Sequence, residues 1–313
     1  MRMKLTDLGE KGMIKRLTSF LEIGDDATYL RYGDRYIVLT TDMIYKKTHI
    51  LPGMNWEQIG KLVVTVNLSD IAAMGARPLA FLLSYGGPDI ELEEFDRFIH
   101  SVDDQCKKYG VKFAGGDTNH TRELTLSGFC LGVTKRPVLR STARVGDTLA
   151  VTGSLGSAAL GTDVLLKKLR YQILEIDDVI KRALEPEPRV KEGVLLSNYA
   201  TAMTDISDSL AVSIHEIAEM SDVGIKLSLD RIPISNSAMN LAERLNLDIM
   251  DYTLYGGGDY ELLFTISEKD FRGIKDRVNA TKIGEVTKEG IIAIKNGEEF
   301  GIEKRGYEHF VKE

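Results

Sequence analysis

The N-terminal half of the chain shows the apolar periodicity of three helices. Apolar residues recur every three or four positions in residues 8–21, 55–76 and 91–109, as they do on the buried face of an amphipathic helix. Asn55 is a residue type that caps helix N-termini, and Gly110 is one that ends helices. We therefore predict three helices with these limits.

Short runs of β-branched and aromatic residues lie between the helices and predict strands. Residues 35–45, 111–118 and 124–134 have this character, and the last two are separated by a polar turn. Residues 148–153 form a further apolar run, after which strand-like and helix-like stretches alternate again. This second alternation indicates a second domain.

A change in composition between residues 135 and 147 marks the expected domain boundary. The stretch KRPVLRSTARVGD is rich in arginine and contains a proline and a glycine. A chain of 313 residues is long enough for two cores, because single cores stop growing at about 250–300 residues. The prolines of residues 183–190 predict another break, which we assign to a loop inside the second domain.

The composition narrows the class of protein. Hydrophobic residues make up 43% and charged residues 28% of the chain, as in ordinary globular proteins. The net charge of −7 disfavours a broad basic surface for nucleic acid. The two cysteines, Cys106 and Cys130, form no disulfide or metal-binding pattern. We expect a cytoplasmic protein without a membrane partner, because the N-terminus lacks a signal-peptide core and no apolar run reaches ~18 residues.

Acidic residues recur at the ends of the expected strands and helices, most of them beside glycine, serine or threonine. They are Asp25, Asp26, Asp42, Asp70, Asp117, Asp205, Asp208, Asp259 and Glu261. A single aspartate in such a place is usually a turn former or a helix cap. So many carboxylates would repel one another if they met without cations. Hard divalent cations take oxygen ligands, and Mg²⁺ is the usual one where phosphates share the site.

Several other kinds of chemistry have no signature in this sequence. The five histidines form no HExxH pair, and neither a GxSxG motif, a P-loop nor the protein-kinase motifs occur. Residues 151–161 predict a strand, a glycine turn and a helix start, which can cradle an anion but is more often a plain turn. Any ATP chemistry in this chain would therefore depend on metal ions in place of a P-loop lysine.

The order of ten short motifs resembles the thiamine-monophosphate kinase family, a relative of aminoimidazole ribonucleotide synthetase. The motifs are LGEKGMI, IGDDAT, TTDMIYKKTHI, NLSDIAAMGARP, GGDTN, RSTARVGD, VTGSLGSAALG, TDISDSL, GGGDYELLF and RGYEHF. They run from residue 8 to residue 310, so the resemblance covers nearly the whole chain. Each motif is short, and their common order and spacing are what is specific.

The resemblance implies an α+β (mixed α/β) fold of two domains. Residues 1–137 would form an N-terminal Mg-ATP-binding domain whose sheet joins that of a dimer mate into a barrel. Residues 138–313 would form a C-terminal α/β domain of sheet and helices that completes the phosphate and substrate site. The implied reaction is transfer of the ATP γ-phosphate to thiamine monophosphate, with several Mg²⁺ ions, in a homodimer.

The resemblance also implies roles for individual residues. The implied metal ligands are Asp26, Thr40, Thr41, Asp42, Asp70, Asp117, Asp205 and Asp208. The implied nucleotide-binding residues are Gly116, Asp117, Arg140 and Ser207, and the implied acceptor-binding residues are His49, Gly258 and Tyr307. Arg140 and Asp208 would take part in catalysis. The attacking phosphate oxygen would already be ionised near pH 7, so direct in-line transfer would need no general base.

Three positions depart from the family pattern. Gly258 stands where the family usually has a glutamate expected to touch the acceptor, and Asp259 or Glu261 could compensate for it. Ser209 replaces a glycine in DISDSL, and Thr142 replaces one in RSTA. The departure at Gly258 bears on the acceptor and leaves the expectation of Mg²⁺ and ATP unchanged.

Two other functions stay open on the sequence alone. The first is ATP-dependent ring closure on a phosphoribosyl substrate, as in aminoimidazole ribonucleotide synthetase, although RGYEHF favours the kinase. The second is an acidic protein that binds Mg²⁺ or Ca²⁺ without turnover, although the chain contains no EF-hand loop. Trp56 and Tyr85 could stack on a ligand ring, but packing in the core or a surface role is the commoner use of such residues.

Overall fold

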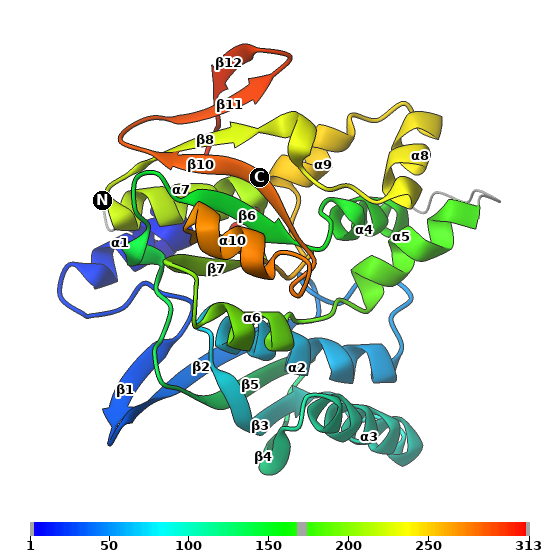
Figure 1. Cartoon of the computed structure of the whole chain (residues 1–313). Coiled ribbons are helices and arrows are strands. Elements are labelled where there is room, and N and C mark those ends of the chain that lie inside the picture. Colours follow the sequence, from blue (N-terminus) through cyan, green and yellow to red (C-terminus); the bar gives the residue numbers. More distant parts are fainter. Residues whose placement is uncertain (1–2, 168–173, 311–313) are drawn as a thin grey trace.

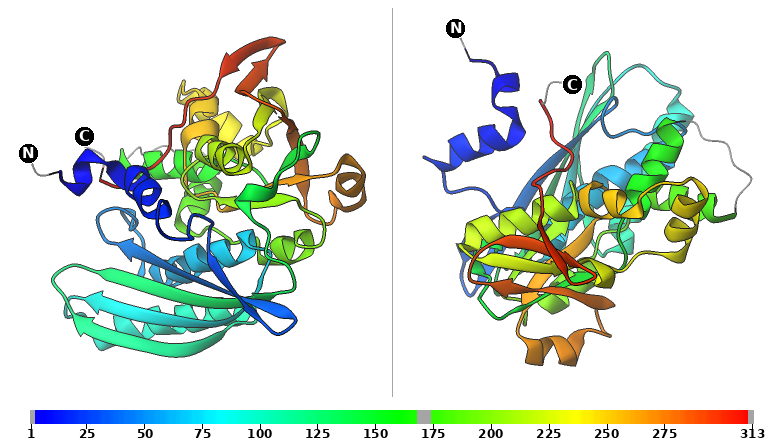
Figure 2. Two further views of the ribbon diagram at one scale, coloured as in Figure 1. Left: turned by 90° about the vertical axis from the view of Figure 1, so that its left-hand side faces the viewer. Right: turned by 90° about the horizontal axis from the view of Figure 1, so that it is seen from above.

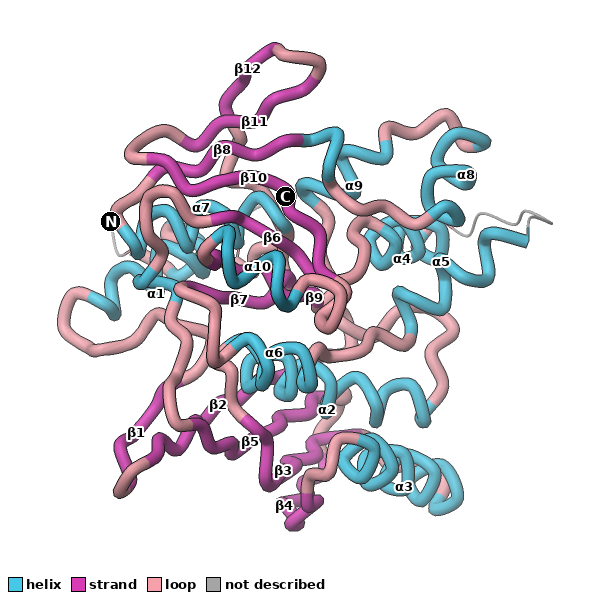
Figure 3. The backbone as a smooth tube through the Cα atoms, viewed as in Figure 1, coloured by secondary structure: helices cyan, strands magenta, loops and turns pink. Residues whose placement is uncertain are grey.

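The chain folds into two domains, each built on a mixed β-sheet (Figure 1). The computed structural model describes residues 3–167 and 174–310. Helices, strands and loops are distinguished along the same view in Figure 3. This is the mixed α/β, two-domain architecture that the sequence led us to expect.

The first domain holds a five-stranded sheet in the order β1-β2-β5-β3-β4. Its strands are β1 (Thr28–Tyr32), β2 (Arg35–Tyr45), β3 (Arg77–Gly87), β4 (Lys112–His120) and β5 (Thr125–Thr134). Only β3 and β4 pair in parallel, and α3 (Leu92–Lys108) makes the crossover between them. The three strands expected in this domain are confirmed as β2, β4 and β5, and β3 lies between the last two.

Helices α2 (Trp56–Ala73) and α3 cover one face of this sheet, and no described element covers the other face (Figures 1 and 2). Along β5, every second residue is buried under the helices, as the two-residue period of a strand requires. Asn55 caps α2 as predicted, because its side chain accepts a hydrogen bond from the Gln58 amide at 2.8 Å. The Gln58 side chain accepts one from the Asn55 amide, which completes a capping box.

The second domain holds a seven-stranded sheet in the order β12-β11-β8-β10-β6-β9-β7. Its strands are β6 (Thr148–Thr152), β7 (Ala202–Ile206), β8 (Gly224–Ser228), β9 (Glu261–Ile266), β10 (Ala280–Thr287), β11 (Ile291–Lys295) and β12 (Glu298–Gly301). Its helices are α4 (Ser157–Leu166), α5 (Leu174–Leu184), α6 (Val190–Leu196), α7 (Leu210–Ser221), α8 (Asn236–Arg244), α9 (Ile249–Tyr255) and α10 (Glu268–Ile274). The pairing of β8 with β11 is parallel, and the other described pairings in this sheet are antiparallel.

Helix α2 lies between the two sheets and joins the domains. It contacts β2, β3 and β5 on one side and β7 and α6 on the other, so most of its side chains are buried. The proline-containing loop between α5 and α6 adds ion pairs across the joint, from Glu185 to Lys61 and from Glu187 to Lys108. The predicted loop is therefore confirmed, and it packs on the first domain.

The two ends of the chain lie side by side (Figure 2). Helix α1 (Gly9–Thr18) begins where the sequence predicts but ends before Leu21, and it stands off the body beside residues 305–310. Within the described ranges, no helix has both the length and the apolar character needed to cross a membrane.

Candidate active site

Three carboxylates from three different elements meet at the joint between the domains. Asp26 lies in the loop before β1, Asp70 in the last turn of α2, and Asp205 on β7. One oxygen atom of each lies within 4.8 Å of the other two. Asp205 is buried and the other two are half-buried. Carboxylates that converge in this way offer an oxygen-rich site of the kind that hard divalent cations prefer.

A pocket of about 200 Å³ opens onto this cluster. Its lining residues are Ile14, Asp25, Asp26, Asp42, Asp70, Arg140, Asp205, Ser207, Asp208, Val212, Ser213 and Glu216. The structure therefore brings together many of the residues that the sequence singled out, although they are spread from residue 26 to residue 208.

Hydrogen bonds from hydroxyl groups hold these carboxylates in place. Thr40 donates to Asp70 at 2.5 Å. Ser69 donates to one oxygen of Asp205 at 2.5 Å, and Ser207 donates to the other at 3.3 Å. Two carboxylate oxygens provide about four acceptor sites, so lone pairs remain for a cation.

Arg140 is the basic residue that lines this pocket. Its guanidinium donates to both oxygens of Asp26, at 2.7 and 3.2 Å, and pairs with Glu216 at 3.2 Å. Asp25 accepts a hydrogen bond from the Arg140 backbone amide at 2.7 Å. The two adjacent aspartates thus hold the side chain and the backbone of one residue. Glu216, on α7, was not predicted, because nothing in the sequence around it marks it as a partner of Arg140.

Burial makes several acids of this pocket resist ionisation. The pKa of Asp205 is raised to about 8, first by burial and then by the negative charge of Asp26. Burial and neighbouring carboxylates also raise the pKa of Asp70, and burial raises that of Asp42. Arg140 lowers the pKa of Asp205 but does not outweigh these effects. A divalent cation among the carboxylates would favour their ionised form.

Three expected site residues lie away from this pocket. Gly116 and Asp117 are on β4, which β3 and β5 separate from β2. Thr41 points away from α2, and its hydroxyl donates to the Gly128 carbonyl at 2.8 Å. A Cβ atom at residue 116 would lie 1.7 Å from the Leu83 carbonyl oxygen, so this pairing of β3 with β4 requires glycine.

Two of the expected acceptor residues lie together beside the pocket. His49 follows β2, Tyr307 lies near the C-terminus, and their ring centroids are 6.5 Å apart. The Tyr307 amide donates to the Asp208 carbonyl at 3.3 Å, which joins this pair to the acidic pocket. Gly258 has φ = +89°, a left-handed conformation that glycine adopts readily and other residues avoid.

The glycine turn within residues 151–161, which could have bound an anion, binds the carboxylate of Asp259. Asp259 accepts hydrogen bonds from the amides of Gly156 at 2.7 Å and Ala158 at 3.2 Å, at the N-terminus of α4. A carboxylate in this place satisfies amides that the helix leaves unpaired. The turn within residues 151–161 is therefore a capped helix start, which is the commoner of the two readings that its sequence allowed.

Both acids that follow Gly258 are bound to other groups of the second domain. Asp259 caps α4, and Glu261 is buried and paired with Arg189. Thr152 donates a further hydrogen bond to Glu261 at 2.6 Å. Both acids thus already have partners within the chain, and compensation by either of them at the acceptor site stays a prediction.

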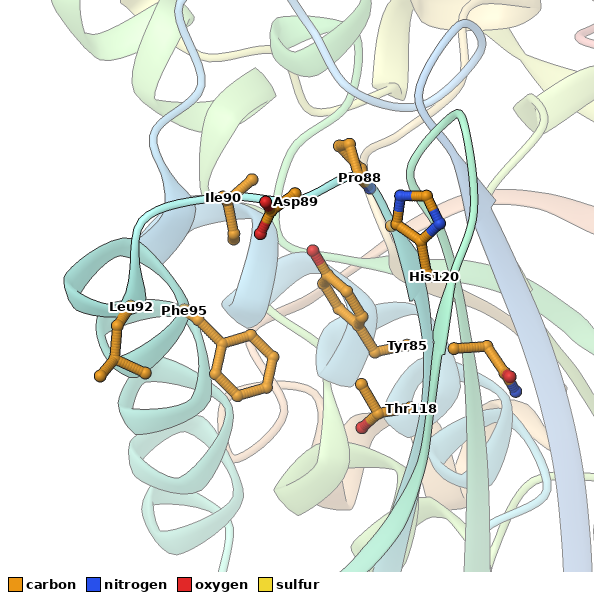
Figure 4. A pocket seen from close by; sticks show the side chains of 10 residues that line it. Tyr85, Pro88, Asp89, Ile90, Leu92, Phe95, Thr118 and His120 are labelled. Atoms are coloured by element: carbon orange, nitrogen blue, oxygen red, sulfur yellow. The ribbon is translucent and has the colours of Figure 1, made fainter.

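A larger pocket of about 340 Å³ lies between the N-terminus of α3 and the ends of β3 and β4 (Figure 4). Tyr85 and Phe95 line it, with ring centroids 5.4 Å apart. Thr118 and Asn119, which follow Asp117 on β4, also line it. The Tyr85 hydroxyl is buried and has no hydrogen-bond partner among the described residues. Tyr85 is thus a core residue, which is one of the two commoner roles expected for it. Its hydroxyl is nevertheless a polar group that lies near a cavity without a partner among the described residues.

Comparison with known proteins gives this architecture a class. The model of the N-terminal domain of AIR synthase related proteins matches residues 24–134, and that of their C-terminal domain matches residues 144–295. The two-domain fold and its acidic pocket thus define an AIR synthase related protein.

Individual relatives narrow this class. The thiamine-monophosphate kinase of Archaeoglobus fulgidus is 37% identical over 91% of this chain and 90% of its own length. That of Aquifex aeolicus is 34% identical over 98% of this chain and 100% of its own length. A solved structure of AaThiL complexed with AMPPCP and TMP matches with a TM-score of 0.92 and 32% identity, over 99% of both chains. The chain belongs to the thiamine-monophosphate kinase family.

Proposed function

We propose that this protein transfers the γ-phosphate of ATP to thiamine monophosphate and releases ADP and thiamine diphosphate. The acidic pocket at the joint of the domains, in a chain of this family, is the observation that carries the proposal. The AaThiL complex with AMPPCP and TMP supports this choice of substrates. Ring closure on a phosphoribosyl substrate has less support, because the relatives described above are named as kinases.

The acids of the pocket would hold the Mg²⁺ ions. Asp26, Asp70 and Asp205 converge on one point, and Asp42 and Asp208 line the same pocket. The family pattern adds Thr40, Thr41 and Asp117 to the ligands. Bound Mg²⁺ would neutralise the negative charges of nucleotide and acceptor, which otherwise repel each other.

Direct transfer in one step fits the groups in this pocket. The attacking oxygen belongs to a phosphate whose second pKa is about 6, so it is ionised near pH 7 without a general base. Burial opposes the charge on Arg140, but Asp26 and Glu216 outweigh it and raise the pKa of the guanidinium. Arg140 would therefore stay charged and stabilise the transferring group. Ser207 and Asp208, on the loop after β7, would position the phosphates.

The nucleotide would extend from the acids toward β4. Gly116 and Asp117 are its family-derived contacts, and the same strand continues into Thr118 and His120 at the larger pocket (Figure 4). We place the adenine ring in this pocket beside Tyr85 and Phe95. Aromatic walls and an unpaired hydroxyl suit a planar heterocycle with hydrogen-bonding edges.

The uncovered face of the five-stranded sheet supports a homodimer. Met43 is 59% and Leu82 39% exposed, and Leu82 is paired across the sheet with Phe129. An exposed apolar sheet face commonly marks an interaction surface. A second copy would cover it, and the two sheets would close into a barrel. Residues 1–137 would then form the ATP-binding and dimerisation domain, and residues 138–313 would complete the phosphate and acceptor site.

The test is incubation of the purified protein with MgATP and thiamine monophosphate, followed by chromatography of the products. Equal amounts of ADP and thiamine diphosphate would establish the kinase reaction with Gly258 in place. Asp205→Asn should abolish turnover, whereas Asp276→Asn, an exposed change outside the pocket, should preserve it. MgATP binding without thiamine diphosphate formation would overturn the assigned acceptor. Isolation of a phosphorylated residue in the protein would overturn direct transfer.

A further inference from the structure

The C-terminal segment caps the N-terminal helix. Glu308 accepts a hydrogen bond from the Lys11 amide, and the His309 carbonyl accepts one from the Glu10 amide, both at 3.2 Å. The Glu10 carboxylate accepts a third from the His309 amide, also at 3.2 Å. Leu8, at the N-cap position of α1, provides no side-chain acceptor, so amides that a helix start leaves unpaired are satisfied from the opposite end of the chain. Figure 2 shows the two segments side by side.

These bonds fix His309 against two of the three residues that the family pattern assigns to the acceptor, His49 and Tyr307. The His309 ring lies 4.9 Å from Tyr307 in a perpendicular arrangement and 5.4 Å from His49, measured between centroids. Tyr307 is 44% exposed and both histidines are half-buried, so the cluster is open to a ligand. Three aromatic rings from two distant segments therefore form one accessible surface.

This ring cluster adjoins the acidic pocket. Ser209 donates to the Arg305 carbonyl at 2.8 Å, and the Tyr307 amide donates to the Asp208 carbonyl. Ile14 of α1 lines the acidic pocket itself. A ligand with a phosphate at one end and an aromatic ring at the other could therefore occupy the pocket and the cluster together.

We propose that His309 is a further acceptor-binding residue, beside His49 and Tyr307, and that Glu10 and Glu308 position it by joining the C-terminal segment to α1. The inference rests on the proposed kinase function and deepens it, because it names a surface that receives the ring of the acceptor. The thiazolium of thiamine monophosphate is a flat cation, which is attracted to the faces of aromatic rings such as Tyr307. Burial and the nearby His309 lower the pKa of His49 to about 4, so His49 is neutral near pH 7 and does not repel this cation.

The first test compares His309→Ala with His309→Phe in steady-state kinetics, with thiamine monophosphate and ATP varied in turn. Loss of the ring should raise KM for thiamine monophosphate about 5- to 10-fold and change KM for ATP less than about twofold. Phenylalanine keeps an aromatic face and should recover most of the loss. Glu303→Ala, an exposed change in the same part of the chain, is the matched control and should behave as the parent.

The second test addresses positioning by Glu308. Glu308→Ala should raise KM for thiamine monophosphate about threefold through loss of one hydrogen bond. Glu308→Gln should restore it, because the amide oxygen can still accept from the Lys11 amide. A merely structural role would raise both KM values together and lower the melting temperature, and that result would overturn the inference.

The outcomes separate this inference from the proposed function. If the parent converts thiamine monophosphate and His309→Ala keeps the parental KM, the inference is wrong and the kinase function stands. If the parent neither converts nor binds thiamine monophosphate in calorimetry with Mg²⁺ and AMPPCP, the proposed function is wrong and the inference falls with it.

Discussion

Each acid of the central cluster has a neighbour of a specific kind, and those neighbours explain why small polar residues surround the aspartates in the sequence. Asp26 is paired with Arg140. The Thr40 hydroxyl donates a hydrogen bond to Asp70, and the Ser69 hydroxyl donates one to Asp205. One guanidinium cannot neutralise three converging carboxylates. The ionised carboxylates would therefore still repel one another, and a bound cation would relieve this repulsion. The three carboxylates thus favour a bound positive charge in addition to that of Arg140.

Gly258 provides a prediction about a single residue. Its φ of +89° disfavours any side chain, although a Cβ atom there would meet only Ala158, at 3.6 Å. Gly258→Ala should therefore lower the free energy of unfolding by about 1 kcal/mol through backbone strain alone. Denaturant unfolding measures this change. The matched control is Gly273→Ala, inside α10 with open space around it, which should stabilise the protein by ~0.5–1 kcal/mol. Equal effects of the two substitutions would contradict this account of Gly258.

The sequence predicts those site residues that stand in short local motifs. Asp26, Asp70 and Asp205 stand in short motifs with small polar neighbours, and the structure brings them together. The roles of Glu216 and Glu308 depend on contacts with Arg140 and with α1. Such contacts arise only when distant segments pack. Glu216 stands in no motif, and the RGYEHF motif that contains Glu308 does not predict its contact with α1.

The N-terminus of helix α4 is capped by Asp259, a residue of the GGGD motif. Asp259 directly follows Gly258, the position that departs from the family pattern. Its carboxylate accepts two hydrogen bonds from backbone amides at the start of α4. Burial raises the pKa of Asp259 to about 7, although those two bonds lower it. The helix therefore depends on a half-buried carboxyl group about 100 residues further along the chain.

We predict that Asp259→Ala destabilises the protein by about 1–2 kcal/mol, the usual range for loss of a helix cap. The amides of Gly156 and Ala158 would lose their acceptor inside the protein, where water cannot easily replace it. Denaturant unfolding of this variant beside Asp276→Ala, an exposed aspartate, gives the comparison. A difference below about 0.5 kcal/mol between the two variants would show that the cap contributes little.

Most of the elements that the sequence predicts have a buried face, and the exception is β4, whose residues are nearly all exposed. Helices α2 and α3 and strands β2, β4 and β5 were expected close to their observed limits. Strands β1 and β3 were not predicted. All five residues of β1 are exposed, so it has no apolar alternation, and β3 begins at an Arg-Pro pair with a nearly continuous apolar run behind it. Both strands are specified by pairing with neighbours, a property that a local window does not contain.

At the scale of the whole molecule, the uncovered sheet face predicts an assembly. Leu82→Glu would place a charge in the centre of the proposed dimer interface, so it should convert a dimer to monomers in sedimentation experiments. Leu166→Glu changes a leucine that is 58% exposed at the end of α4, outside the sheet face, and should leave the dimer intact. A parent protein that sediments as a monomer would contradict the dimer outright.

The joint between the domains predicts how stability depends on pH. Asp26 and Asp70 come from the first domain and Asp205 from the second, so the cluster can repel only in the folded chain. The pKa of Asp205 is about 8 in the folded protein, against an ordinary 3.8. Between these values the folded chain keeps a proton that the unfolded chain has released. Without Mg²⁺, the free energy of unfolding should therefore fall as pH rises from about 4 to 8.

Melting curves at pH 6 and pH 8, with and without Mg²⁺, measure this dependence. A loss of ~1 kcal/mol would lower the melting temperature by about 1.5 °C in a protein of this size. Mg²⁺ binds ionised carboxylates, so it should raise the melting temperature more at pH 8, where less of the binding energy is spent on releasing protons. Asp205→Asn cannot ionise, so its melting temperature without Mg²⁺ should fall less between the two pH values, and Mg²⁺ should raise it less. A parent that is equally stable at both pH values without Mg²⁺, with Asp205→Asn behaving identically, would mean that the carboxylates do not share a buried site in solution.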